Sequence, residues 1–192
     1  AEVEKCAWVC DYYSENGAAM LADEPVKTEA RESFITYQPQ GVILGVMPWN
    51  FPYWQFFRAA VPALLAGNAF VLKHASNVPR CALAIENIFR EAHWPKDLVR
   101  VILAGPEGAA VALAHDLVRG VTLTGSAAAG AQVAALAGTV LKKCVMELGG
   151  SDPYLILEDA DLDHAAKLCA QARCGNAGQT CIAAKSFIAI ES

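Results

Sequence analysis

The residue best suited to covalent chemistry in this chain is a cysteine in an unusual setting. Cys181 ends the run GNAGQTC, whose small and polar residues leave little bulk to shield a thiol. Only the thiolate form of cysteine attacks well, so a reactive cysteine needs a group that activates it. No histidine stands near Cys181, and all four histidines, His74 among them, are expected in helices or connectors. Glu147 is the better partner that the sequence offers.

Two further polar side chains could take part in such chemistry. Glu147 stands in MELGG at a predicted strand end, and a carboxylate in a half-buried cleft can act as a general base. Asn50 stands between aromatic residues and prolines in MPWNFP, where its amide could donate to a developing oxyanion. Taken singly, the plainer interpretations are a solvated glutamate and a turn asparagine.

Other residues could hold a phosphate or a ribose. Lys73 ends a predicted strand in VLKHAS and could bind either group, although a lone lysine there is commonly a surface residue. Ser76 could simply cap the next helix. The stretch TGSAAAG places Gly125, Ser126 and Gly130 at a strand-to-helix junction, where free N–H groups suit a pyrophosphate. It is neither a GxGxxG motif nor a P-loop, so by itself it indicates only a turn.

These residues need a scaffold that places them together. Strands rich in Val, Ile and Leu alternate with single helices, which is typical of a parallel sheet covered on both faces. Ligands of such sheets bind beyond the carboxyl ends of the strands, and Asn50, Lys73, Gly125 and Glu147 all fall just after strands. The predicted strands are 42–48, 69–75, 98–105, 119–126, 141–150 and 185–192. The predicted helices are 1–22, 51–67, 78–94, 105–116 and 127–138. A polar break is predicted at 22–33, and a further β segment runs from residue 34 to the turn QPQG.

The composition of the 192 residues fits a globular chain and limits its partners. Hydrophobic residues make up 55% and charged residues 18%, and the formal net charge is −5. No basic stripe occurs, which argues against nucleic acid or an anionic membrane, and no apolar run is long enough for a transmembrane helix. Seven cysteines without a CxxC pair argue against a disulfide framework and a zinc site. We expect reduced, mostly buried cysteines, no metal and a cytoplasmic protein.

Six sequence motifs occur in the order typical of one enzyme superfamily. They are PWNFP (48–52), ALLAGNAFVLK (63–73), VTLTGSAAAG (121–130), MELGGSDP (146–153), LEDADLD (157–163) and GNAGQTC (175–181). On these motifs the chain resembles the aldehyde dehydrogenases over residues 34–192. The stretches LKHASNVP (72–79) and GQTCIAAKSFI (178–188) look like the bacterial NAD(P)-dependent succinate-semialdehyde dehydrogenase branch.

The resemblance implies an α/β fold with a Rossmann-like parallel sheet and helices on both faces. It implies an N-terminal helix and β segment at 1–40, a dinucleotide-binding domain at 41–165 and the start of a catalytic domain at 166–192. We expect both ends to be cut from a longer chain, before most of the catalytic domain. The full-length protein is expected to form a homo-oligomer.

The resemblance also implies roles for single residues. Cys181 would add to an aldehyde to give a thiohemiacetal, which loses hydride to the nicotinamide and becomes a thioester. Glu147 would activate the water that releases the acid, while Asn50 and the N–H of Cys181 hold the oxyanion. The small residues before Cys181 would let substrate and nicotinamide approach its sulfur from opposite sides. The residues implied in cofactor binding are Pro48, Trp49, Lys73, Ser76, Gly125, Ser126, Leu148 and Gly149.

Two departures bear on the cofactor and the substrate. Many NAD-preferring relatives carry a glutamate for the ribose hydroxyls where this chain has Ser76, so NADP is expected to serve at least as well as NAD. Arg58, eight residues after Asn50, matches an arginine that binds the substrate carboxylate in the succinate-semialdehyde branch, although a structural role is equally expected. Ser186 stands where the family often has arginine, which leaves the branch open.

Three alternatives remain at this point. The chain could be a non-catalytic dinucleotide-binding fragment in which Cys181 is inert. It could belong to an aldehyde dehydrogenase with another substrate. A CoA-acylating aldehyde dehydrogenase is a third alternative, but such enzymes commonly lack the base glutamate, so MELGG argues against it.

Overall fold

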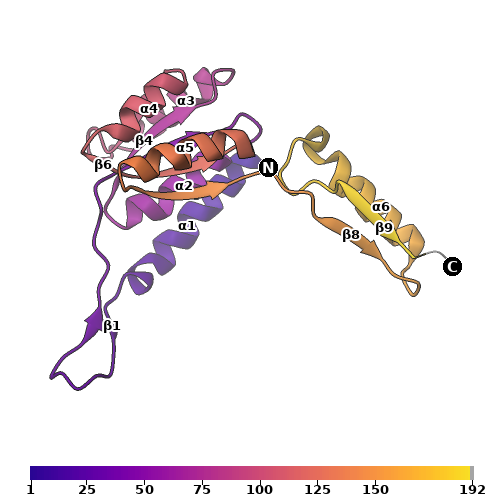
Figure 1. Ribbon diagram of the computed structural model, residues 1–192, viewed down its shortest axis with the longest axis horizontal. Coiled ribbons are helices and arrows are strands. Elements are labelled where there is room, and N and C mark those ends of the chain that lie inside the picture. The colour runs from indigo at the N-terminus through magenta and orange to yellow at the C-terminus, as the bar shows by residue number, and fades with distance from the viewer. Residues whose placement is uncertain (191–192) are drawn as a thin grey trace. The chain divides into compact units, whose positions relative to one another are not determined.

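The computed structural model describes residues 1–190 (Figure 1). The chain divides into two compact units, residues 1–147 and the residues from Leu148 onward. The positions of these units relative to one another are not determined. The first unit holds the parallel sheet, and the second holds a helix and two short strands.

Five parallel strands form the sheet of the first unit. They are β3 (Val42–Met47), β4 (Ala69–His74), β5 (Val99–Ile102), β6 (Val118–Thr124) and β7 (Lys143–Glu147). Their order across the sheet is β5-β4-β3-β6-β7, so the chain builds outward from β3 on one side and then on the other. The predicted parallel α/β sheet is confirmed, and its order reverses between β3 and β6. Ligands of such sheets bind at this reversal, beyond the carboxyl ends of the strands.

Helices cover both faces of the sheet, as predicted (Figure 1). On one face lie α2 (Trp54–Leu65) and α3 (Pro79–Glu91), and α1 (Glu2–Met20) packs on α2. On the other face lie α4 (Pro106–Ala114) and α5 (Ala127–Thr139), which contact β6 and each other. Each helix between two strands therefore returns the chain to the amino end of the sheet.

Two hydrophobic clusters hold these layers together. In the larger one, Phe56 of α2 and Phe70 of β4 are fully buried and meet edge to face at 5.4 Å between ring centroids, with Ile85 of α3 beside them. In the smaller one, Leu44 of β3 packs with Leu113 of α4. Burying a side chain of this size stabilises the fold by about 2 kcal/mol, so both faces of the sheet contribute.

Local signals explain where several helices begin and end. Pro79 and Pro106 occupy the first positions of α3 and α4, where a missing N–H costs nothing. Gly67 follows α2 with a φ of +84°, a left-handed conformation that glycine adopts without strain. Ser126 caps α5, because its side chain accepts a hydrogen bond from the N–H of Ala129.

The segment between α1 and β3 differs from the prediction. It contains two short antiparallel strands, β1 (Glu24–Pro25) and β2 (Phe34–Ile35), which form an arm (Figure 1). Only a polar break was predicted at residues 22–33. That was wrong for β1, because its pairing depends on β2 rather than on any apolar pattern of its own.

The second unit is small and open. Its strands β8 (Pro153–Ile156) and β9 (Ser186–Ala189) pair in parallel, and α6 (Leu162–Cys174) packs on β8. A 3-10 turn, Gly175–Gly178, follows α6. The strand predicted at 185–192 is found as β9, and its last two residues lie outside the described part.

All seven cysteines are free, and most are not buried. Only Cys6 is buried, whereas Cys144, Cys174 and Cys181 are exposed. The expectation of mostly buried cysteines was wrong for two physical reasons. Cys144 lies on β7 at the edge of the sheet, and the second unit is too small to enclose many side chains.

Candidate functional site

The sheet brings four of the predicted site residues to its carboxyl edge. Gly125 directly follows β6, and Asn50 follows β3 by three residues. Lys73 and Glu147 are the last but one residue of β4 and the last residue of β7, so they end their strands rather than follow them. All four lie at the edge where the strand order reverses or beside it.

Asn50 lies in a segment, residues 48–53, that leads from β3 into α2. Pro48 and Asn50 are half-buried in this segment, and Trp49 is exposed. The segment is fixed at its far end, because the ring of His74 bonds to the carbonyl of Pro52 at 2.8 Å. His74 is the buried last residue of β4, within the strand predicted at 69–75 and not in a helix or connector.

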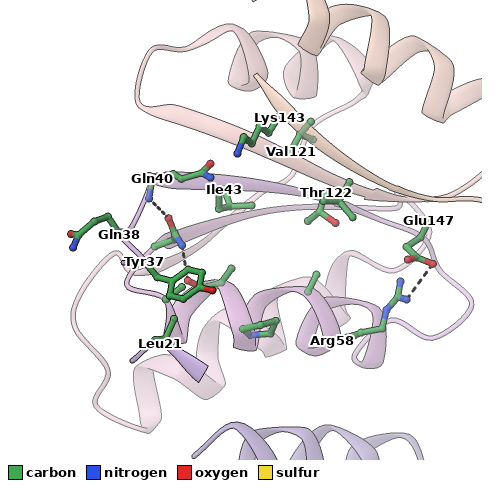
Figure 2. Close-up of a pocket in the computed structure, with 17 residues that line it drawn as sticks. Leu21, Tyr37, Gln38, Gln40, Ile43, Arg58, Val121, Thr122, Lys143 and Glu147 are labelled. Atoms are coloured by element: carbon green, nitrogen blue, oxygen red, sulfur yellow. Dashed lines mark hydrogen bonds and ion pairs between the residues drawn. The ribbon is translucent and has the colours of Figure 1, made fainter. Parts of the chain in front are cut away.

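Glu147 has an ion-pair partner in the same unit. Its Oε2 lies 3.4 Å from Nη1 of Arg58 on α2, and both side chains are partly exposed. Nη2 of Arg58 also donates to Gln55 Oε1 and to Thr124 Oγ1, each at 3.1 Å. The guanidinium therefore holds the carboxylate at the sheet edge (Figure 2). Arg58 and Glu147 both line a groove of about 590 Å³ beneath β6 and β7.

Lys73 lines a separate cavity on the opposite face of the sheet. The cavity has a volume of about 390 Å³ and lies against α4, α5 and the ends of β3 and β6. Lys73, Glu107 and Gln132 are the polar residues of its lining, and the rest are apolar or small. A cavity of this kind fits the flat base of a nucleotide, with the lysine available to a ribose or phosphate. The apolar residues are Leu44, Val46, Pro106, Ala109, Ala110, Leu113, Leu123, Ala129, Val133 and Leu136.

The position of α4 and α5 as walls of this cavity was not predicted. Both helices are rich in alanine, and their short side chains form part of the cavity lining. Two placements also need correction. Gly130 lies inside the first turn of α5 rather than at the junction, and Ser76 does not cap α3, whose N-cap is Val78. Ser76 is instead exposed in the loop between β4 and α3.

Ser126 combines two properties that suit an anion. It lies at the N-terminus of α5, a helix of 13 residues, and its Oγ accepts from the N–H of Ala129 at 3.2 Å. The first N–H groups of a helix carry partial positive charge and attract phosphate groups. Gly125 before it is half-buried and has space around its Cα.

Cys181 lies in the second unit and is exposed, as predicted. Its carbonyl accepts a hydrogen bond of 2.7 Å from Nζ of Lys185. The turn before it is left-handed, with φ values of 50° at Asn176, 55° at Ala177 and 75° at Gly178. Such a conformation is strained for alanine, which indicates a segment shaped by more than local preference.

The end of α6 supports this turn. Nη1 of Arg173 lies 3.4 Å from the carbonyl of Ala184, and a Cβ added at Gly178 would lie 3.3 Å from the same guanidinium. Leu148 and Gly149, implied in cofactor binding, are exposed at the start of the unit. Asn50 and Glu147 belong to the first unit, so the structure does not relate them to Cys181.

Comparison with known proteins settles the family. The model of the aldehyde dehydrogenase family matches residues 1–192. The chain belongs to the aldehyde dehydrogenase family. Its sheet is therefore the aldehyde dehydrogenase sheet. The resemblance drawn from six motifs over residues 34–192 is confirmed, and the family match also includes residues 1–33.

Several members of the family are similar to it. A probable succinate-semialdehyde dehydrogenase (NADP+) of Synechocystis is 57% identical over 188 residues, and a succinate semialdehyde dehydrogenase (NAD(P)+) of Escherichia coli is 49% identical. A solved succinic semialdehyde dehydrogenase of Streptococcus pyogenes with NADP+ has a TM-score of 0.95 and 40% identity. These comparisons cover 98% of this chain but only 41% of each relative.

Within residues 1–190, no helix is long and apolar enough to cross a membrane. Across the same residues, no group of three or more histidine, cysteine, aspartate or glutamate side chains is placed to hold a metal ion.

Proposed function

We propose that the whole protein, of which this chain is a part, oxidises succinate semialdehyde to the acid with NADP. The names of its relatives support this substrate and cofactor. The single observation that carries the proposal is the exposure of Cys181 in its run of small residues, in a chain of this family. An accessible thiol is what a nucleophile for an aldehyde requires.

Three side chains of this chain would share the covalent chemistry. The thiolate of Cys181 adds to the aldehyde carbon, and the carbonyl oxygen becomes an oxyanion. The side-chain amide of Asn50 and the N–H of Cys181 donate to that oxygen, which is worth about 3 kcal/mol for each such donor. Glu147 takes a proton from the water that hydrolyses the thioester, and Arg58 holds its carboxylate at the sheet edge.

Most of the residues that would hold the cofactor lie in the first unit. The cavity lined by Lys73 has the size and apolar walls that an adenine needs. The N-terminus of α5, at Gly125 and Ser126, would receive the phosphates, and Ser76 would lie beside the ribose. When bound, NADP supplies the acceptor for the hydride that the aldehyde must lose. Pro48, Trp49, Leu148 and Gly149 would line the nicotinamide side.

Arg58 would contribute to substrate choice. Its guanidinium is only partly exposed and already contacts Glu147 and Thr124, so a substrate carboxylate would have to share it. A planar guanidinium can serve two carboxylates, because it carries five N–H donors. An aldehyde dehydrogenase of other specificity is the alternative, in which Arg58 only orients Glu147.

Thiol alkylation of the 192-residue chain tests the proposed nucleophile. We expect iodoacetamide to label Cys181 faster than the other six cysteines, and NADP to change that rate. Cys144 and Cys174, also exposed, are the matched controls. In the whole protein, the Cys181→Ser variant should form no reduced cofactor from succinate semialdehyde. Equal labelling of Cys181 and both controls, with no effect of NADP, would leave the non-catalytic dinucleotide-binding alternative.

A further inference from the structure

One buried histidine ties two parts of the first unit together and has no role in the chemistry above. His74 is 4% exposed and ends β4. Its Nε2 lies 2.8 Å from the carbonyl of Pro52, and its Nδ1 lies 2.9 Å from the backbone nitrogen of Ala75. The N–H of Ala75 also donates to the carbonyl of Met47 at 2.9 Å, so Nδ1 shares that donor. A carbonyl only accepts, so Nε2 carries a proton and donates it to Pro52.

The carbonyl of Pro52 belongs to the segment that carries Asn50. Just beyond it, the N–H groups of Tyr53 and Trp54 both donate to Oε1 of Glu2 on α1, at 2.9 and 2.8 Å. Three consecutive backbone groups at the start of α2 are thus held by side chains from other elements. Pro52 is half-buried, and loss of the His74 bond would leave its carbonyl without this donor, at a cost in free energy.

The neighbour of His74 faces the opposite way. Side chains of consecutive strand residues point to opposite faces of a sheet. Lys73 lines the cavity against α4 and α5, whereas His74 bonds to Pro52 on the face that α2 covers. One rigid strand end therefore carries a cofactor residue on one face and an anchor of the Asn50 segment on the other.

We infer that His74 is a positioning residue, whose Nε2–H sets the Asn50 segment relative to the strand end that carries Lys73. The inference rests on the proposed function in one respect, the role of Asn50 toward the oxyanion. A displacement of about 1 Å at a catalytic group can cost on the order of 100-fold in rate, so an anchor at this place matters for turnover. A mere packing role would need no hydrogen bond of defined direction.

The first test is nitrogen NMR on the 192-residue chain with labelled histidine. We expect His74 to show a protonated Nε2 and a bare Nδ1 at neutral pH, with slow exchange of the Nε2 proton. A ring with its proton on Nδ1, or one that averages between tautomers, overturns the inference. This measurement needs no variant, so it holds whether or not substitutions at position 74 fold.

A pair of substitutions separates the hydrogen bond from packing. The terminal nitrogen of His74→Gln reaches about as far as Nε2, whereas His74→Asn offers a polar group only near Nδ1. We expect amide exchange at Tyr53 and Trp54 to rise on the order of tenfold in His74→Asn and to stay within about twofold of the parent in His74→Gln. Equal exchange in both variants overturns the inference.

Turnover by the whole protein then distinguishes the inference from the proposed function. His74→Asn should lower kcat about tenfold and leave KM for NADP within about twofold, with kcat restored in His74→Gln. If Asn50→Ala lowers kcat but His74→Asn does not, the inference fails and the function stands. If Asn50→Ala leaves kcat unchanged, the proposed role of Asn50 fails, and the amide-exchange result still decides whether His74 anchors the segment.

Discussion

Ser76 is the residue on which the preference between the two nicotinamide cofactors is expected to depend. A glutamate there would repel the 2′-phosphate of NADP, whereas serine can donate to it. We expect Ser76→Glu to weaken NADP binding by the 192-residue chain about tenfold and to leave NAD binding equal or tighter. Isothermal titration with both cofactors measures this. Ser76→Gln introduces a side chain of the same shape as glutamate but without its charge, so this variant should keep most of the NADP affinity. An unchanged NADP/NAD ratio in Ser76→Glu contradicts the prediction.

His74 links protonation to stability. Burial lowers the pKa of His74 below its ordinary value of 6.5. The carbonyls of Pro52 and Met47 favour the charged ring, but the effect of burial is larger. Of the nearby charged groups, Lys73 lowers this pKa and Glu2 raises it. The unfolded chain therefore takes up a proton at higher pH than the folded chain. The contribution of His74 to the free energy of unfolding should be complete above the pKa that this residue has in the unfolded chain. It should decrease as the pH falls from that value toward the lower pKa of the folded chain.

Urea unfolding above and below the unfolded pKa checks this dependence. The parent chain should lose more stability on acidification than His74→Gln, which has no titrating ring. The carboxylates are common to both chains, so their contribution cancels in the difference. Identical losses in the two chains would show that His74 titrates alike when folded and unfolded.

At the scale of an element, two substitutions at the N-terminus of α5 distinguish its effect on the stability of the fold from its effect on NADP binding. Ser126→Ala removes the cap on the N–H of Ala129 and should lower the free energy of unfolding by about 1 kcal/mol. Ser126→Asp keeps a capping oxygen but adds a negative charge, so it should keep stability and weaken NADP binding about tenfold. Thermal unfolding and titration with NADP measure the two effects. If Ser126→Asp binds NADP with unchanged affinity, the phosphates of NADP do not bind at the N-terminus of α5.

At the scale of the whole molecule, Arg58 has two possible partners in the reaction, the carboxylate of the substrate and the carboxylate of Glu147. It is ion-paired with Glu147, and it is also the expected ligand of the substrate carboxylate. In the whole protein, Arg58→Met should lower kcat/KM for succinate semialdehyde roughly 30-fold through a lost charged hydrogen bond. Butanal has no carboxylate and should be affected far less. Equal losses for both aldehydes would show that Arg58 acts on Glu147 alone.

Local patterns account for the parts of the fold that could be predicted. Four strands of the sheet, β3 to β6, are rich in Val, Ile and Leu and are separated by amphipathic or alanine-rich helices, and each pattern lies within a few residues. Parallel strands share one carboxyl edge, so the common placement of Asn50, Lys73, Gly125 and Glu147 also followed. β1 was missed because a two-residue strand has no period to detect and exists only through its pairing with β2.

The sequence by itself determined the family, the parallel sheet and the exposure of Cys181, since these depend on motifs and on periodicity along the chain. Only the tertiary structure decided which side chains meet. Arg58 bonds to Glu147 and Thr124, and His74 bonds to Pro52, across helices and strands far apart in sequence. Such contacts depend on the register and spacing of packed elements, and no local sequence pattern encodes the distance between two atoms on different elements.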